Sequence, residues 1–296
     1  MRMLIRLWDE EEKGHRMFED WLEYRKQTFA LAVSHTPWRA DRVENLERMR
    51  PILMKTHHLA HRVFDEKAPN WKWSRDMWGW GVSQSVTHTV YVQDDLELAE
   101  DFWPMVKAMV AANPNNVIAL LSNHPFAVRA AAAGHNWYKC CEVLGAAYVF
   151  PTAMMGAFLE WRDTRTEGII KSTNEDAMMT NWLWFTERRA WNPIPAPVQS
   201  KNDVIDSTNP REGRYLFRAS YVFAGKGFNY RPLDWINQAY WEIRPHVEDY
   251  GYSVSRSWPD MRDGWPQGPP VEGSVKRAHD VYVNGLGGEE RKKYNV

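Results

Sequence analysis

The sequence predicts an α/β protein with a mainly parallel central sheet and helices on both faces. Three short runs, at 29–33, 87–93 and 117–121, have the apolar and β-branched content of buried strands. Segments with helical spacing of apolar residues separate them, and this alternation is typical of parallel sheets. The chain has 296 residues, of which 44% are hydrophobic and 25% charged, so it can bury a large core.

The expected elements alternate regularly along the first half of the chain. Asp41 and Glu44 have the spacing of a capping box, which marks the start of the first helix. A Trp-rich helix that ends near Gly79 or Gly81 leads into the third strand. In order, we expect strand 29–33, helix 41–53, strand 58–64, a helix from 70 to about 79–81, strand 87–93, helix 97–112 and strand 117–121.

The expected elements continue in the second half, with a short helix containing Phe158, Leu159 and Trp161 after its first strand. Residues 146–150 should form a strand, and a helix should begin at Thr173 and end at Asn192-Pro193. The segment 195–199 should be extended. We divide the chain into a helical N-terminal extension at 1–27, an α/β domain at 28–224 and a C-terminal helical or irregular extension at 225–296.

The composition gives no sign of a general affinity for nucleic acids or membranes. The formal net charge is −1, so no overall basic field attracts polyanions. No run of 18 apolar residues occurs, and the first residues lack the apolar core of a signal peptide. The two cysteines, Cys140 and Cys141, are adjacent and cannot build a disulfide framework, which favours a reducing compartment. We therefore expect a cytoplasmic protein that does not span a membrane.

The main functional signal is the acid pair Asp94-Asp95, which follows the strand at 87–93. In open α/β sheets, ligands bind at the carboxyl ends of the strands. Two neighbouring carboxylates repel each other, so they need a cation or hydrogen-bond donors beside them. Mn²⁺ or Mg²⁺ holding a diphosphate would supply that charge. The alternative is an acidic turn that binds no ligand.

Four motifs follow one another along the chain: Gln93-Asp94-Asp95, Phe102-Trp103-Pro104, Glu175-Asp176 and Pro195-x-Pro197-Val198. Their order resembles that of GT-A-fold glycosyltransferases, in the small form that bacteria and phages encode. The resemblance covers residues 28–224, and two features differ from the usual pattern. Gln93 stands where a strict DxD motif has its first acid, and no histidine follows the Pro-x-Pro-Val segment.

The resemblance implies a nucleotide-sugar donor, expected to be a UDP-sugar, and it assigns residues to the donor's nucleoside. Ser34, His35 and Thr36 would lie near the nucleotide base, with Asp65 beside them. The acceptor would be a glycan, a protein side chain or, if the source is a phage acting in its host's cytoplasm, a hydroxymethylated DNA base. The oligomeric state and the stereochemical outcome stay open, although inversion by direct displacement is favoured.

The resemblance also implies a metal site and a general base. Asp95 would bind Mn²⁺ or Mg²⁺ directly, Asp94 would face the ribose or a metal-bound water, and Lys201 would offset phosphate charge. Asp176 would accept the proton of the acceptor hydroxyl, with Glu175 as a second candidate.

Other interpretations of the same motifs are open. The first turn of a helix favours a carboxylate, so Asp176 is also compatible with a helix cap and no catalytic role. A nucleotidyltransferase on a similar sheet, or a non-catalytic module that binds nucleotide-sugars, would present the same motifs.

Overall fold

The computed structural model covers most of the expected α/β domain. It describes residues 27–56, 59–66, 70–121, 127, 130–131, 134–140, 143, 145–165, 170, 175–200, 223–224 and 240–242. The expected extensions at 1–27 and 225–296 fall almost entirely outside these residues. Within this part of the chain, no helix has the length and apolar character that crossing a membrane requires.

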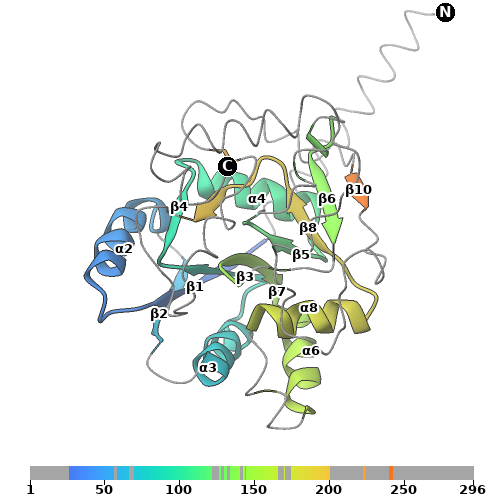
Figure 1. The fold of residues 1–296 in the computed structure, drawn as a ribbon, viewed down its shortest axis with the longest axis horizontal. Helices are drawn as coiled ribbons and strands as arrows, with labels where there is room; N and C mark the ends of the chain where they lie inside the picture. Colours follow the sequence, from blue (N-terminus) through green and yellow to red (C-terminus); the bar gives the residue numbers. More distant parts are fainter. Residues whose placement is uncertain are drawn as a thin grey trace, which may run out of the picture.

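A mixed sheet forms the centre of the fold (Figure 1). Its strands lie in the order β10-β6-β8-β5-β7-β3-β1-β2. Their bounds are β1 Phe29–His35, β2 Ala60–Asp65, β3 His88–Gln93, β5 Val117–Ala119, β6 Trp137–Cys140, β7 Ala147–Pro151, β8 Ala190–Pro193 and β10 Tyr240–Glu242.

The α/β class is confirmed, and the strand directions refine it. β1 pairs in parallel with both β2 and β3, as expected for the first units of the chain. β7 lies between β3 and β5 and is antiparallel to both, and β6 is antiparallel to β8. Strand direction leaves no trace in the hydrophobic pattern, because a buried strand has the same composition in either orientation.

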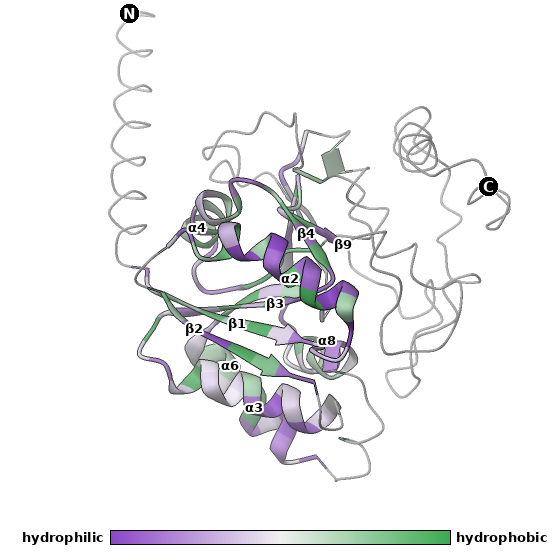
Figure 2. Cartoon of the chain, turned by 90° about the vertical axis from the view of Figure 1, so that its left-hand side faces the viewer, coloured by the Kyte–Doolittle hydropathy of each residue, from purple (hydrophilic) through white to green (hydrophobic). Residues whose placement is uncertain are grey.

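Helices cover both faces of the sheet (Figures 1 and 2). α2 Ala40–Leu53 and α4 Phe102–Ala112 lie on one face. α3 Asn70–Ser83, α6 Thr152–Asp163 and α8 Glu175–Phe185 lie on the other. Alternation along each strand supplies both cores, since Val90 and Val92 of β3 point into the first cluster and Tyr91 points into the second.

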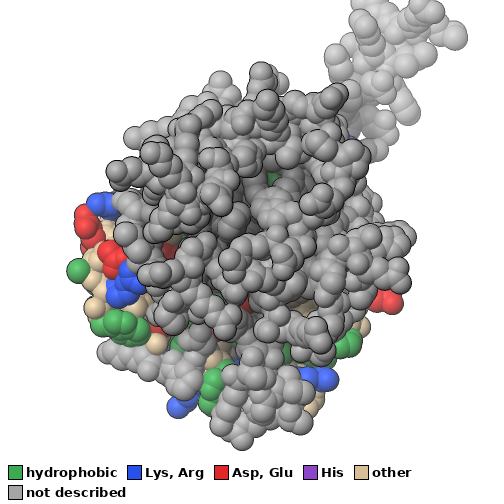
Figure 3. All heavy atoms as spheres, viewed as in Figure 1, with side chains coloured by type: hydrophobic (Ala, Val, Ile, Leu, Met, Phe, Trp, Pro, Cys, Tyr) green, Lys and Arg blue, Asp and Glu red, His purple; other side chains and the backbone are tan. Residues whose placement is uncertain are grey.

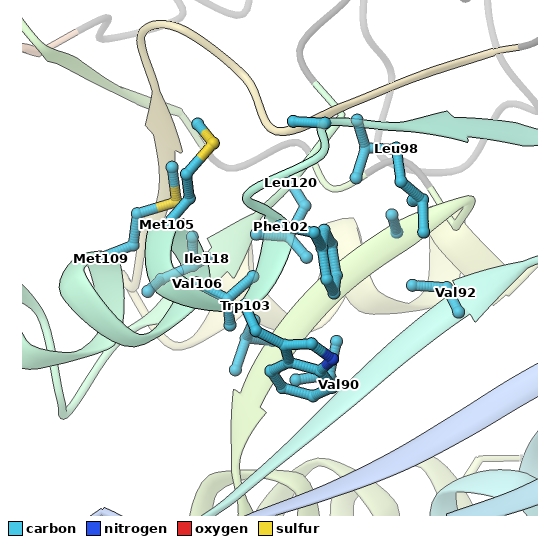
Figure 4. Packing of buried hydrophobic residues seen from close by; sticks show 14 of the residues in the cluster. Val90, Val92, Leu98, Phe102, Trp103, Met105, Val106, Met109, Ile118 and Leu120 are labelled. Carbon is cyan, nitrogen blue, oxygen red and sulfur yellow. The ribbon is translucent and has the colours of Figure 1, made fainter. Parts of the chain in front are cut away.

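The core beneath α4 is mainly apolar. Phe102, Trp103 and Val106 pack over Val90 of β3 and Ile118 of β5, as Figure 4 shows. The side chain of Trp103 also donates a hydrogen bond of 2.7 Å to the Leu53 carbonyl at the end of α2. This bond gives the buried indole N–H a hydrogen-bond partner.

The residues after the acid pair differ from the expectation. We expected a helix from residue 97, but Leu96–Leu98 form β4, which pairs antiparallel with β9 Val198–Ser200 in a separate two-stranded sheet. Leu96 and Leu98 are buried and Glu97 is exposed. This two-residue alternation is the strand signal, and three residues are too few for it to stand out in the sequence.

Two details of the first helices also differ. The capping box expected at Asp41 and Glu44 does not form, because α2 begins at Ala40 and Asp41 instead pairs with Arg39. α3 continues through both of its glycines to Ser83. Gly81 is needed there for space, since a Cβ at this position would lie 2.2 Å from the hydroxyl oxygen of Tyr91.

The helix expected to reach Asn192-Pro193 ends earlier, and the residues Ala190–Pro193 form β8 instead. α8 ends at Phe185, and Glu187 adopts a left-handed conformation with φ of 54°. The Arg188 N–H then bonds back to the Leu183 carbonyl at 2.8 Å, which is the closing bond of a Schellman motif. A left-handed non-glycine residue is uncommon, so the composition alone did not mark this stop.

The outer side of α2 carries charges of both signs (left in Figure 3). Arg48 pairs with Glu44, and Arg50 pairs with Glu47. These exposed pairs along one helix produce no net basic surface, in agreement with the near-neutral charge of the chain.

Candidate functional site

The predicted site residues gather where the strand order reverses. From β1, the chain adds β2 on one side and β3 on the other, so the carboxyl ends of β1 and β3 flank a topological switch point. Open α/β sheets bind ligands in the crevice at such a point. Ser34 and His35 end β1, Thr36 follows it, and Asp94-Asp95 follow β3, so the fold brings these two predicted segments together.

Asp94 is completely buried and holds three donors of the protein. Its Oδ2 accepts hydrogen bonds of 2.7 Å from the Thr36 backbone N–H and from Nδ1 of His35. Because a carboxylate only accepts, Nδ1 of His35 carries the hydrogen. Oδ1 of Asp94 pairs with Nη1 of Arg42 at 2.8 Å. Asp94 therefore fixes the loop after β1 instead of facing a ligand.

Asp95 shares the same arginine. Its Oδ2 lies 2.9 Å from Nη1 of Arg42, so one guanidinium bridges the two neighbouring carboxylates. Its Oδ1 is buried and has no hydrogen-bond partner among the residues that the structure describes. The side-chain amide of Asn45 holds the backbone of the pair, with bonds of 2.7 Å to the Asp94 carbonyl and 2.9 Å to the Leu96 carbonyl.

The sequence interpretation missed Arg42 and Asn45. Both lie on the buried stripe of α2, at helical spacing from Leu46, Met49 and Leu53. A polar residue at a core position of an amphipathic helix is the signal that could have identified them, because such a residue needs a buried partner.

Glu66 is a second residue that the sequence interpretation missed. It follows β2, and its carboxylate accepts hydrogen bonds from the Ser34 hydroxyl and, at 3.2 Å, from the Thr36 hydroxyl. Asp65, which we expected beside the base, has an exposed side chain. Burial is the main cause that raises the pKa of Glu66, while the Ser34 hydrogen bond opposes it. Adjacent strand residues point to opposite faces, so one position decides which acid turns inward.

A pocket opens beside this loop, between α3, β7 and the first turn of α8. It has room for about one water-sized molecule, so a hydroxyl group can enter but a whole sugar ring cannot. Its polar lining includes Ser34, Gln93 and Glu175. The remaining walls are mainly aromatic and come from Trp73, Trp78, Tyr91 and Tyr148.

Glu175 is the acid that faces this pocket. Its Oε1 is buried and lacks a hydrogen-bond partner among the described residues. Burial, with a smaller contribution from the neighbouring Asp176 carboxylate, raises the pKa of Glu175 to about 7. Asp176 packs against Gly145: a Cβ added to Gly145 would lie 3.4 Å from the Cβ of Asp176. Of the two candidate bases, Glu175 is the one that lines the pocket.

The acid pair does not fit the two-carboxylate metal site that the resemblance implies. Asp94 is sealed by protein donors, and the guanidinium of Arg42 already lies between it and Asp95. Within the described part of the chain, no three His, Cys, Asp or Glu side chains form a group that could hold a metal ion. Lys201, the expected phosphate contact, lies outside the described residues.

No protein-family model matches the chain, and a search of curated proteins finds no match either. The function is therefore inferred from the chemistry of the site itself. That chemistry consists of a sealed acid pair, a hydroxyl-rich loop and a carboxylate with a near-neutral pKa beside a small pocket.

Proposed function

We propose that this protein transfers a sugar from a nucleotide-diphosphate donor, expected to be a UDP-sugar, to a hydroxyl acceptor. The observation that carries the proposal is Glu175, a carboxylate with a near-neutral pKa in a pocket at the switch point of the sheet. Strongly shifted acids in a cleft are typical of catalytic sites, and a switch point is where α/β sheets bind nucleotides. The GT-A resemblance supplies the reaction type.

In this reaction Glu175 acts as the general base. The acceptor hydroxyl oxygen attacks the anomeric carbon of the donor, and the bond from that carbon to the diphosphate breaks. The hydroxyl proton passes to the Glu175 carboxylate, and the nucleoside diphosphate leaves with the bonding electron pair. A base with a pKa near the working pH is efficient in this role, and such a group contributes about 10²–10⁴-fold to the rate.

The small volume of the pocket suits this role. A hydroxyl can enter and reach Glu175, while the rest of the acceptor stays outside. Asp176, the base that the sequence pattern favours, shares the first turn of α8 but packs on Gly145. Glu175 is therefore favoured over Asp176 as the base because it lines the pocket.

Binding of the donor is tested by thermal denaturation with a panel of nucleoside diphosphates and nucleotide-sugars, each measured with Mn²⁺ and with a chelator. A ligand at 100 times its dissociation constant should stabilise the protein by about 2.7 kcal/mol. We expect a shift with one nucleotide, which is lost in Asp95→Ala and kept in Asp101→Ala, an exposed acid whose side chain makes no capping hydrogen bond to α4. If no member of the panel shifts the transition in either condition, the proposal fails.

Turnover with the identified donor then separates a transferase from a non-catalytic binding module. Release of the nucleoside diphosphate supports sugar transfer, whereas release of pyrophosphate would indicate a nucleotidyltransferase. Because the ionised carboxylate is the active form, the rate should rise as the pH passes through about 7. Glu175→Gln should lose about 10²–10⁴-fold, and Asp176→Asn should lose less. The reverse order would return the role to Asp176.

A further inference from the structure

The acid pair is expected to hold a divalent metal, yet it already has a resident cation. Nη1 of Arg42 lies 2.8 Å from Asp94 Oδ1 and 2.9 Å from Asp95 Oδ2. An arginine side chain stays charged at every working pH, so this positive charge is permanent. The bridging position between the two carboxylates is therefore occupied by the protein itself.

Asp94 cannot release an oxygen to a metal without breaking other contacts. Both of its oxygens accept bonds from the protein, including the Thr36 backbone N–H, and its side chain is fully buried. Each bond to a charged acceptor is short and strong, and a donor left without a partner in the interior is costly. A metal at Asp94 would thus disrupt the loop that carries the candidate nucleoside contacts.

Arg42 is also held in place by its helix. Its side chain is only 6% exposed, and it shares the buried stripe of α2 with Asn45, which fixes the Asp94 carbonyl. α2 packs on the core through Leu46 and Met49. Displacing the guanidinium would require movement of this helix, and a dication close to it would be repelled.

We propose that Arg42 replaces the divalent metal at the acid pair, so that this protein binds its nucleotide donor without Mn²⁺ or Mg²⁺. The inference rests on the proposed function for the identity of the ligand. Arg42 acts through Asp94 and Asp95 and is a positioning residue, not a catalytic one. Asp95 Oδ2 pairs with the guanidinium, and Asp95 Oδ1 has no hydrogen-bond partner among the described residues, so it can accept a hydroxyl hydrogen of the donor.

The experiment measures Mn²⁺ and nucleotide binding separately on the full chain. Binding of Mn²⁺ alone is followed by the electron paramagnetic resonance signal of the free ion, for wild type and Asp95→Asn. The dissociation constant of UDP, or of the panel nucleotide that binds, is measured by calorimetry in EDTA and in Mn²⁺. We expect no Asp95-dependent Mn²⁺ binding and a change in nucleotide affinity below about threefold.

Asp95-dependent capture of Mn²⁺, or a tightening of nucleotide binding by about tenfold or more in Mn²⁺, would overturn the inference and leave the transferase proposal intact. Absence of nucleotide binding in both conditions would instead count against the proposed function, while the Mn²⁺ measurement still decides this inference.

A variant of the arginine adds a readout that a merely structural role would not move. Arg42→Gln removes the resident charge and leaves two uncompensated carboxylates, so added Mn²⁺ should raise the melting temperature of this variant and leave that of the wild type unchanged. A rise in wild type as large as in Arg42→Gln would contradict the inference. If Arg42→Gln does not fold, the two wild-type measurements suffice.

Discussion

Two acidic clusters meet at the same edge of the sheet, and they are compensated in opposite ways. In the first, Asp94 and Asp95 share one buried arginine, and Asp94 also accepts a backbone N–H. In the second, Glu66 and Glu175 both have a raised pKa, caused mainly by burial. The neighbouring Asp94 also raises the pKa of Glu66. Asp176 and Glu66 both raise the pKa of Glu175.

This difference distinguishes carboxylates that stabilise the fold from carboxylates that can take part in a reaction. A carboxylate whose oxygens are occupied by protein donors, as in Asp94, holds a loop in place. A buried carboxylate whose pKa is raised to about 7, as in Glu175, can exchange protons with a ligand near neutral pH. Asp94 therefore belongs to the framework, and the less conspicuous Glu175 belongs to the pocket.

The largest expected effect comes from breaking the compensation of the first cluster. Arg42→Ala leaves the fully buried Asp94 and the largely buried Asp95 without their cation, so it should lower the free energy of unfolding by about 3–5 kcal/mol. The matched control is Arg48→Ala on the same helix, whose pair with Glu44 is exposed and should contribute less than about 1 kcal/mol. Urea denaturation of both variants checks this. Equal losses of unfolding free energy would show that the contact of Arg42 with Asp94 and Asp95 does not stabilise the fold.

A slightly smaller effect of opposite sign is expected in the second cluster. Glu175 has a pKa of about 7 when folded and an ordinary pKa near 4.5 when unfolded. Between these values the folded state binds more protons, so the wild type should lose stability as the pH rises through this window. The loss should reach about 3 kcal/mol above pH 7.

Glu175→Gln removes this titration and should be more stable than wild type at pH 8, with the difference vanishing near pH 4.5. Denaturation curves across the pH range measure it, with the exposed Glu160→Gln as the control that should follow the wild type. A constant difference between Glu175→Gln and wild type at every pH would mean that the raised pKa is absent.

The smallest effect concerns Tyr91, which lines the pocket beside Glu175 and packs closely against Gly81 of α3. A Cβ at Gly81 would lie 2.2 Å from the hydroxyl oxygen of Tyr91, so Gly81→Ala should cost about 1–3 kcal/mol. Gly79→Ala is the control on the same helix, because its Cβ would meet only the flexible end of Arg75. This control should be neutral or stabilising by up to about 1 kcal/mol. Thermal denaturation distinguishes them, and equal stability would show that α3 can shift away from β3.

Much of the fold could be predicted from the sequence, and the candidate site only in part. The buried strands around 29–33 and 87–93 were recognisable because composition and local pattern mark them directly. The short strands β4, β6 and β8 were not recognised, since three or four residues carry too little periodicity. The sequence placed Ser34 to Thr36 in a loop, whereas β1 continues to His35, and the partners of these residues and of the acid pair were not recognised.

By itself, the sequence determined the α/β class, the acids at the strand ends and the near-neutral charge, because each of these depends on residues that are close in the chain. Only the tertiary structure decided that Arg42 reaches Asp94, 52 positions away, and that Glu66 instead of Asp65 meets the Ser34 hydroxyl. Such contacts depend on strand register and on which face of a helix is buried, and these are set by packing across the whole domain.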